Sequence, residues 1–248
     1  MKGYFPKKAM ILAAGYGKRM RSHDDSVPKP LVQVGGKPLI DWSLDLVQSA
    51  GINEVVVNTS YMADVLEAYL SQRASPTIII SREEGEPLET GGGIKNALPL
   101  LGDEPFFVLN SDVISLNGAR PLLQSMAERW DPEEMDGLML MASAANASGY
   151  YGRGDFSMGA EGVLQRRGEH ETVPFIFAGI QLLHPRIFND APDGAFSMNV
   201  LYNKSINPDR TLPYFRGIAH EGVWLHVGDG SGKASAEKRL HDLCVNSA

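Results

Sequence analysis

The chain has 248 residues, of which 43% are hydrophobic and 21% are charged, values that are ordinary for a soluble globular protein. That length suits one α/β domain, or one domain with a small lobe, and allows a substantial core. The formal net charge of −7 argues against general nucleic-acid binding, which is accompanied by a basic excess. An anionic nucleotide would therefore have to be held by local cations against the overall charge.

The sequence favours a cytoplasmic location. Lysines precede an apolar run near the start, as in a secretory signal, but the run at residues 10–14 is too short for the apolar region of a signal peptide. No stretch approaches the roughly 20 apolar residues that span a bilayer. The single cysteine, Cys244, excludes an intrachain disulfide and is consistent with a reducing compartment. We expect a soluble cytoplasmic protein without a membrane partner.

A glycine-rich stretch follows the first predicted strand. Residues 10–14 form a short apolar run typical of a buried strand, and Gly15 and Gly17 then let the backbone turn with its N–H groups uncovered. Lys18 and Arg19 follow at once, so uncovered amides beside cations indicate a phosphate site. The stretch lacks the glycine pattern of dinucleotide-binding and P-loop proteins. The alternative is a glycine turn followed by solvated basic residues.

Helices and strands alternate over the next part of the chain. We predict helices over residues 38–50 and 63–72 and strands over residues 54–58 and 77–81. Alternating units of this length predict a mainly parallel sheet with helices on both faces. Such a sheet binds ligands at the carboxyl ends of its strands, where the glycine loop would lie.

Two later segments place polar residues beside predicted structural boundaries. Thr90 is a candidate N-cap for a helix that ends at Leu98, and the three glycines after it allow backbone to approach a ligand closely. Residues 105–110 are predicted to form a buried strand. Asp112 follows it, where a carboxylate can hold Mg²⁺ against phosphate oxygens. A purely structural turn is the alternative for each segment.

The second half of the chain mixes strands and helices. Residues 137–143 are methionine-rich and are expected to fill the core rather than bind a metal. Residues 228–233 are interpreted as a linker, because they lack the first glycine and the final Ser/Thr of a P-loop. The remaining predictions are helices over residues 116–130, 196–206 and 233–243, a turn at 185–188, and strands over 150–157, 175–183, 212–215 and 223–227.

The string L-A-A-G-x-G-x-R-M at residues 12–20, followed by P-K-P-L at residues 28–31, resembles the signature of the sugar-1-phosphate nucleotidyltransferases, or NDP-sugar pyrophosphorylases. The resemblance covers about residues 8–243. It implies a Rossmann-like three-layer α/β/α fold of the GT-A-like type, with a mostly parallel mixed sheet, in a single domain over residues 1–248. It also implies that Arg19 and Lys29 stabilise the phosphates during transfer. The residues that it implies around the nucleoside triphosphate are Leu12, Ala13, Ala14, Gly15, Gly17 and Lys18.

Further strings are similar to the family pattern. P-L-E-T-G-G at residues 87–92 resembles the segment that reads the nucleobase, which implies base contacts by Glu84, Thr90 and Gly91. Asp112 corresponds to the metal-binding aspartate of the family's N-G-D-V string. The G-R-G-D-F and F-x-G-I strings and the strand before Asp112 imply contacts with the sugar. The residues implied are Asn110, Gly154, Asp155 and Gly179. Arg166 and Arg167 are expected in a solvated hairpin, from which one could reach the sugar phosphate.

The chain departs from the family pattern at one metal ligand. Relatives carry W-x-D-V-G-T near the C-terminus, whereas Trp224-Leu225-His226 places a histidine where their aspartate stands. His226 could coordinate directly, which would favour Mn²⁺ over Mg²⁺. Alternatively, Asp112, phosphates and water complete the Mg²⁺ shell without it, which is the outcome we favour.

The resemblance implies an enzyme that joins a nucleoside triphosphate to a sugar 1-phosphate, giving an NDP-sugar and pyrophosphate. Glu89, where many relatives carry glycine, is most similar to the branch that uses UTP and N-acetylmuramate 1-phosphate in cell-wall sugar recycling. One alternative is a mannose-1-phosphate guanylyltransferase or a relative of the phosphocholine cytidylyltransferases. Another is a nucleotide-binding paralogue with impaired turnover, which the histidine at 226 motivates. No nucleic-acid partner is expected.

Overall fold

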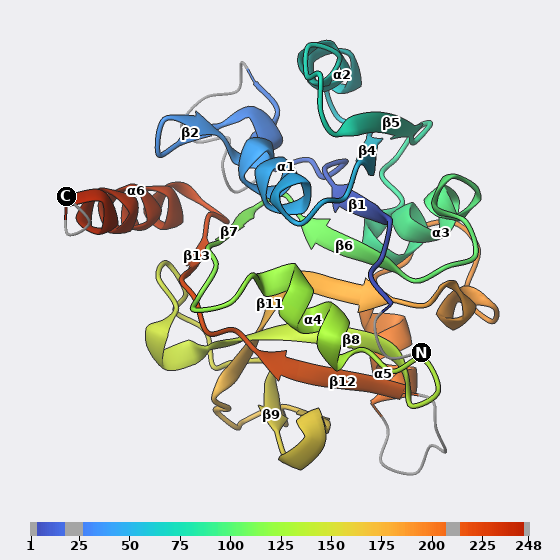
Figure 1. Cartoon of the computed structure of the whole chain (residues 1–248), viewed down its shortest axis with the longest axis vertical. Coiled ribbons are helices and arrows are strands. Elements are labelled where there is room, and N and C mark those ends of the chain that lie inside the picture. The colour runs from blue at the N-terminus through green and yellow to red at the C-terminus, as the bar shows by residue number, and fades with distance from the viewer. Residues whose placement is uncertain (1–3, 18–26, 207–213, 246–248) are drawn as a thin grey trace.

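The structure is a computed structural model, and it describes residues 4–17, 27–206 and 214–245. Its main feature is a nine-stranded mixed sheet with helices on both faces (Figure 1). Strands lie in the order β10, β9, β11, β6, β1, β4 and β5, and β8 joins β12 to the sheet by pairing with β11.

The parallel half of the sheet consists of β1 (Lys8–Leu12), β4 (Glu54–Thr59), β5 (Thr77–Arg82) and β6 (Phe106–Asn110). Strand β1 lies between β4 and β6 and pairs parallel with both, and β5 pairs parallel with β4. The parallel arrangement predicted from the alternating elements is therefore confirmed. As a result, the carboxyl ends of these strands meet at one edge of the sheet.

The other half of the sheet is built around β11 (Phe175–Leu183), which runs antiparallel to β6 and to β8 (Met135–Ser143). Strand β12 (Tyr214–Ala219) pairs parallel with β8. Strands β9 (Phe156–Met158) and β10 (Leu164–Arg166) pair antiparallel, and β9 contacts the start of β11. Because β11 is antiparallel to β6, its first residues lie beyond the carboxyl end of β6.

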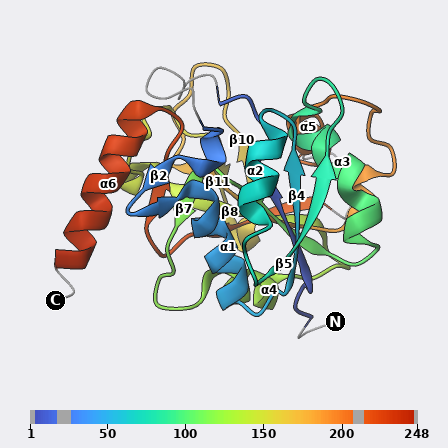
Figure 2. The same ribbon diagram turned by 90° about the horizontal axis from the view of Figure 1, so that it is seen from above.

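Side chains alternate between two apolar clusters along the central strands. In β1, Ala9 and Ile11 belong to one cluster and Met10 to the other. Figures 1 and 2 show the helices on either side of the sheet, which confirms the predicted three-layer α/β/α fold. The first cluster includes residues of α1 (Leu39–Ser49), α2 (Ala63–Leu70) and α4 (Leu122–Arg129), and the second includes residues of α3 (Glu89–Leu101) and α5 (Asn199–Ser205).

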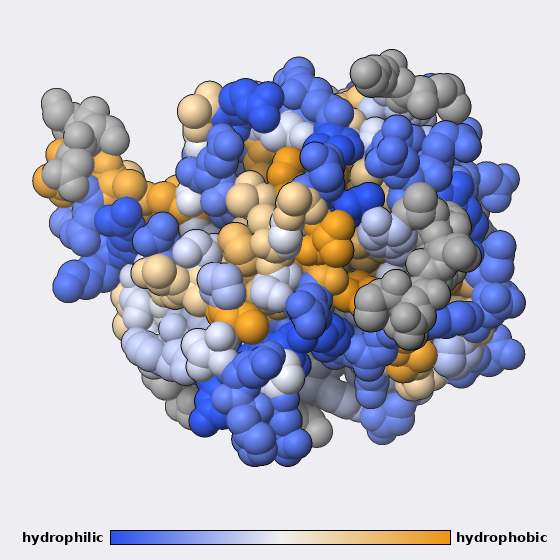
Figure 3. Space-filling model, turned by 90° about the horizontal axis from the view of Figure 1, so that it is seen from below, coloured by the Kyte–Doolittle hydropathy of each residue, from blue (hydrophilic) through white to orange (hydrophobic). Residues whose placement is uncertain are grey.

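A small third cluster lies beside the carboxyl ends of the strands. There β7 (Val113–Ser115) pairs with β13 (Trp224–His226), and β2 (Gln33–Val34) pairs with β3 (Lys37–Pro38). Helix α6 (Gly230–Val245) contributes Ala236 and Leu240 to this cluster and lies at one side of the molecule, with the C-terminus at its end (Figures 1 and 2). The space-filling view shows a projection on one side of the molecule (Figure 3). The described residues contain no helix with both the length and the apolar character needed to cross a membrane. Short 3-10 helices occupy Lys29–Leu31, Ala144–Asn146, Ala160–Gly162 and Pro185–Phe188.

Two predicted elements are shorter than expected. Helix α4 begins at Leu122 rather than at residue 116, because residues 113–115 form a strand and the side chain of Asn117 accepts a hydrogen bond from the Leu122 amide at 2.9 Å. The strand predicted over residues 150–157 is confined to β9, since its pairing with β10 begins only at Phe156. The methionines of β8 are buried in the core, as predicted.

The interpretation of residues 228–233 as a linker was wrong, because α6 begins at Gly230. The Asp229 carboxylate accepts hydrogen bonds from the Gly232 amide at 2.9 Å and from the Ser231 hydroxyl at 2.7 Å, so it acts as the N-cap of this helix. The bond from the Gly232 amide is the main cause that holds the pKa of Asp229 below its usual value. The strand predicted over residues 212–215 falls partly outside the described residues, and β12 continues to Ala219.

Candidate functional site

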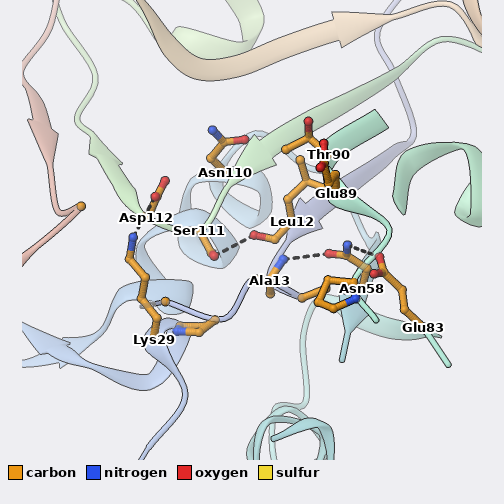
Figure 4. A pocket seen from close by; sticks show the side chains of 16 residues that line it. Leu12, Ala13, Lys29, Asn58, Glu83, Glu89, Thr90, Asn110, Ser111 and Asp112 are labelled. Carbon is orange, nitrogen blue, oxygen red and sulfur yellow. Dashed lines mark hydrogen bonds and ion pairs between the residues drawn. The ribbon is translucent and has the colours of Figure 1, made fainter. Parts of the chain in front are cut away.

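A cavity of about 310 Å³ opens at the carboxyl ends of β1 and its neighbours, the edge at which parallel sheets bind ligands (Figure 4). Segments that are far apart in the sequence meet around it. Its described lining consists of Leu12, Ala13, Ala14, Gly15, Gly17, Lys29, Pro30, Asn58, Glu83, Pro87, Glu89, Thr90, Asn110, Ser111, Asp112 and Gly228.

The loop after β1 forms one wall of the cavity. Its lining residues, Leu12 to Ala14 with Gly15 and Gly17, are those predicted to surround the nucleotide. Gly17 has a φ of +61°, and a Cβ at this position would lie only 2.8 Å from the Cβ of Lys29. Glycine is therefore required for the loop to pass this close to Lys29. The predicted phosphate ligands Lys18 and Arg19 lie outside the described residues.

Lys29 and Asp112 form an ion pair at one side of the cavity, with 2.8 Å between Nζ and Oδ2 (Figure 4). Lys29 is flanked by two prolines, whose fixed φ angles restrict the direction of its side chain. Asp112 lies in the turn between β6 and β7, and its carbonyl oxygen accepts a hydrogen bond from the Val227 amide at 3.0 Å. The two side chains keep 13% and 29% of their surface exposed, so an anionic ligand can reach Lys29 and a cation can reach Asp112.

A buried polar pair supports the opposite wall, and the sequence reasoning missed it. Asn58, the residue before the last of β4, accepts a hydrogen bond from the Ala13 amide and donates one to the Glu83 carboxylate, each at 2.7 Å. The second carboxylate oxygen of Glu83 accepts a hydrogen bond from the Leu88 amide at 2.8 Å. The pair therefore joins the loop after β1 to the segment before α3. In the sequence, Asn58 stands out only as the polar residue that directly follows the apolar run 55–57.

The residues predicted at the nucleobase are arranged differently from expectation. Thr90 lines the cavity but is not an N-cap, because α3 already begins at Glu89 and the Thr90 hydroxyl accepts a hydrogen bond from the Met198 amide at 2.9 Å. Gly91 lies behind the wall against the ring of Phe196. Glu84 is exposed and does not line the cavity, whereas its neighbour Glu83 does.

The residues predicted at the sugar fall into two groups. Asn110 lines the cavity, and Gly179 lies beside it on β11, where an added Cβ would be 3.2 Å from the Asn110 Cβ. Gly154 and Asp155 do not line the cavity. The Asp155 carboxylate instead accepts a hydrogen bond from the Phe177 amide at 3.0 Å, which attaches the segment before β9 to the start of β11.

His226 does not line the cavity. Its ring stacks on Trp224, with 5.8 Å between centroids and 9° between planes. Within the described ranges, no cluster of three or more His, Cys, Asp or Glu side chains could hold a metal.

Three acidic residues belong to the described lining of the cavity, of which Glu83 is bonded to Asn58 and to a backbone amide, Glu89 begins α3, and Asp112 pairs with Lys29. Mg²⁺ keeps several waters and needs few protein ligands, so a single carboxylate such as Asp112 is compatible with binding it.

The sequence matches the model of the MobA-like NTP transferase domain over residues 9–178. The chain belongs to this family. It is 42% identical over 239 residues to N-acetylmuramate alpha-1-phosphate uridylyltransferase of Caulobacter vibrioides, a match that covers 95% of this chain and 97% of that protein. It is 34% identical over 225 residues to the Neisseria meningitidis protein of the same name, covering 89% of this chain and 93% of the relative.

The fold of this MobA-like NTP transferase also occurs in solved structures. The structure of HddC from Yersinia pseudotuberculosis complexed with GMP-PN superposes with a TM-score of 0.74 at 21% identity, covering 94% of this chain and 99% of that one. The nucleotidyltransferase class predicted from the glycine loop and the P-K-P-L string is thus confirmed at the level of the family and the fold.

Proposed function

We propose that this chain transfers a uridylyl group from UTP to N-acetylmuramate 1-phosphate, giving UDP-N-acetylmuramate and pyrophosphate. The observation that carries the proposal is the cavity itself, because it brings the glycine loop, Lys29 and Asp112 to the same carboxyl edge as Thr90 and Asn110. The choice of substrates rests on the two bacterial relatives of that name, which match this chain over nearly their whole lengths. The glutamate at position 89 points the same way.

In this proposal the reaction is a single displacement at the α-phosphorus of UTP. A phosphate oxygen of the sugar 1-phosphate forms the new P–O bond, and the bond from the α-phosphorus to the pyrophosphate oxygen breaks, so no covalent enzyme intermediate is needed. The chain contributes position and charge: the uncovered amides of the loop after β1 hold the triphosphate, and the Lys29 ammonium offsets charge that develops on the phosphate oxygens.

Asp112 would hold a Mg²⁺ ion in this site, which would neutralise phosphate charge when bound. Its carboxylate fits that role, because it is a hard oxygen ligand inside the cavity and sits 2.8 Å from the Lys29 ammonium, the group we place at the phosphates. Arg19 is proposed to act together with Lys29 on the phosphates, on the family motif alone. The proposed setting is recycling of cell-wall sugars in the cytoplasm.

The test is a matrix of substrates with the purified protein in Mg²⁺ and in Mn²⁺. UTP, CTP, GTP and ATP are each combined with N-acetylmuramate 1-phosphate, N-acetylglucosamine 1-phosphate, mannose 1-phosphate and phosphocholine, and pyrophosphate release is followed. UTP with N-acetylmuramate 1-phosphate should give the highest kcat/KM, with the UDP-sugar identified by mass spectrometry. Faster turnover of GTP with mannose 1-phosphate would overturn the proposal. Nucleotide binding without turnover in any combination would indicate an impaired paralogue.

A further inference from the structure

Glu89 has a backbone conformation that is unfavourable for a residue with a side chain. Its φ is +59°, in the left-handed region that favours glycine, and among the described non-glycine residues Met62, Glu89 and Glu161 have positive φ angles. Such conformations gather at sites where a ligand is held. Of these three residues, Glu89 lines the cavity. A glycine would adopt the same backbone without this cost, so the reason for a glutamate lies in its side chain.

The Glu89 carboxylate is not used by the fold. It is exposed, it lines the cavity, and within the described part of the chain it has no hydrogen bond and no ion pair. Two other glutamates of the same segment are bonded, because Glu83 accepts a hydrogen bond from the Asn58 side chain and Glu86 accepts one from the Tyr16 hydroxyl. These bonds attach the segment to the rest of the site without Glu89.

The charge of Glu89 restricts what it can bind. The cavity has to hold a triphosphate, and Lys29 is the one cation of its described lining. A further carboxylate beside the phosphates would weaken their binding by Coulomb repulsion. Because a carboxylate accepts hydrogen bonds and donates none, Glu89 suits a neutral part of a substrate that carries O–H or N–H donors.

Glu89 lies across the cavity from the groups that we place at the phosphates. Figure 4 shows it beside Thr90, with the pair formed by Lys29 and Asp112 on the other side. In a nucleoside triphosphate the ribose joins the α-phosphate to the base. A nucleotide whose α-phosphate lies near Lys29 can therefore place its neutral part, the ribose and the base, against the wall that contains Glu89 and Thr90.

We propose that Glu89 binds the ribose of the nucleoside triphosphate through its 2′- and 3′-hydroxyls. The proposal rests on the proposed function, in which the second substrate is N-acetylmuramate 1-phosphate. That sugar carries an acetamide at C2 and the lactyl ether at C3, so it has no pair of neighbouring hydroxyls, and Glu89 would repel its carboxylate. The ribose offers two adjacent O–H donors to the two carboxylate oxygens. An acidic residue holds a ribose hydroxyl in the same way in dinucleotide-binding folds.

The test compares UTP with 2′-deoxy-UTP and 3′-deoxy-UTP, each with N-acetylmuramate 1-phosphate, by the kcat/KM for pyrophosphate release. Glu89→Gly should lower kcat/KM for UTP about 10–100-fold, the usual effect of losing hydrogen bonds to a charged group. It should also reduce the preference for UTP over each deoxynucleotide at least about threefold, because the lost carboxylate and the missing hydroxyl belong to one interaction. Glu89→Gln keeps one acceptor oxygen and should retain part of this preference.

Glu161 provides the matched control. It has the same φ of +59°, but it does not line the cavity, and its carboxylate pairs with Arg129 at 3.2 Å. Glu161→Gly places a glycine in the same conformation outside the site, so it should leave kcat/KM and the preference for UTP unchanged. In thermal unfolding both glycine variants should have a Tm at or above that of the wild type, because glycine fits a positive φ.

Equal losses on UTP and on both deoxynucleotides in Glu89→Gly would show that the carboxylate does not bind the ribose, and would overturn the proposal. Wild-type activity in Glu89→Gly would also overturn it, while leaving the proposed function intact. The proposed function fails separately, if the wild-type protein does not join UTP to N-acetylmuramate 1-phosphate. In that case the three nucleotides are compared by calorimetric binding in Mg²⁺, and an equal affinity of the wild type for all three would overturn the role of Glu89.

Discussion

Replacing Asn58 by alanine should be among the most damaging single changes near the cavity. Asn58 is 2% exposed and its partner Glu83 is 5% exposed, and the amide side chain makes two hydrogen bonds of 2.7 Å, from the Ala13 amide and to the Glu83 carboxylate. Asn58→Ala leaves a backbone N–H and a carboxylate oxygen without partners. Each such group costs about 1–3 kcal/mol when it stays buried.

Summed over the two groups, the cost is about 2–6 kcal/mol. We expect Asn58→Ala to lower the free energy of unfolding by about 2–4 kcal/mol, the lower half of this range. The reason is that Asn58 lines the cavity, so water can enter and pair with part of what the side chain leaves. The loop after β1 also loses its attachment at Ala13. The KM for the nucleoside triphosphate should therefore rise in the same variant.

Urea denaturation followed by circular dichroism measures this loss. Asn96→Ala is the control, because Asn96 is exposed on α3 and its hydrogen bond to the Ser81 hydroxyl is long, at 3.4 Å. Its effect should stay within about 0.5 kcal/mol. A loss below about 1 kcal/mol for Asn58→Ala, or an equal loss in both variants, would refute the reasoning about the buried pair.

The other predictions concern charge, metal and pH. Lys29→Ala should lower the single-turnover rate of pyrophosphate release about 10²–10³-fold. The free energy of unfolding should change little, because the ion pair of Lys29 with Asp112 is partly exposed. Near wild-type turnover would show that Lys29 has no role in the mechanism. His226→Asp should keep or raise turnover with Mg²⁺, because it restores the carboxylate of the family pattern at the cost of a ring that lies outside the described cavity lining and stacks on Trp224; an inactive variant would reveal another role for the histidine. Burial lowers the pKa of His220 below its usual value of 6.5, so the folded protein favours the neutral imidazole. The free energy of unfolding is therefore unaffected by this shift above about pH 6.5. It decreases as the pH falls from that value toward the lower pKa of the folded state. Between about pH 7.5 and 5.5 the Tm of the His220→Gln variant should therefore fall less than the Tm of the wild type. Equal falls in Tm would contradict a destabilising protonation of His220.

Sequence reasoning located the elements whose pattern is local. Strand β11 spans the predicted residues 175–183, because an apolar run of that length between turn signals has few alternatives. The loop after β1 and Asp112 were placed at one site because parallel strands end at one edge of the sheet, and Lys29 was placed with them by the resemblance of the P-K-P-L string to the family signature. Their proposed roles remain predictions.

Features that depend on distant partners were missed or misplaced. The start of α4 was placed too early because the pairing of β7 with β13 joins residues about a hundred positions apart. Glu84 was chosen where Glu83 lines the cavity, although side chains alternate along a strand: Ser81 and Glu83 are buried while Arg82 and Glu84 are exposed. Thr90 fits the local rule for a cap, but its hydroxyl is used by the Met198 amide, which no local pattern reveals.

The start of α3 has a consequence for the order of folding. A Cβ on Gly91 would meet the Phe196 ring, one on Gly92 would meet the Gly194 carbonyl, and one on Gly93 would lie 2.7 Å from the Glu83 carboxylate. Three consecutive glycines disfavour a helical turn by about 1 kcal/mol each relative to alanine, so this turn has little stability of its own. The contacts that stabilise it come from the segment around Glu83 and from the segment that contains Gly194 and Phe196, both of which must already be in place. The turn should therefore form after the transition state for folding, so that loosening its contacts speeds unfolding and leaves the refolding rate nearly unchanged.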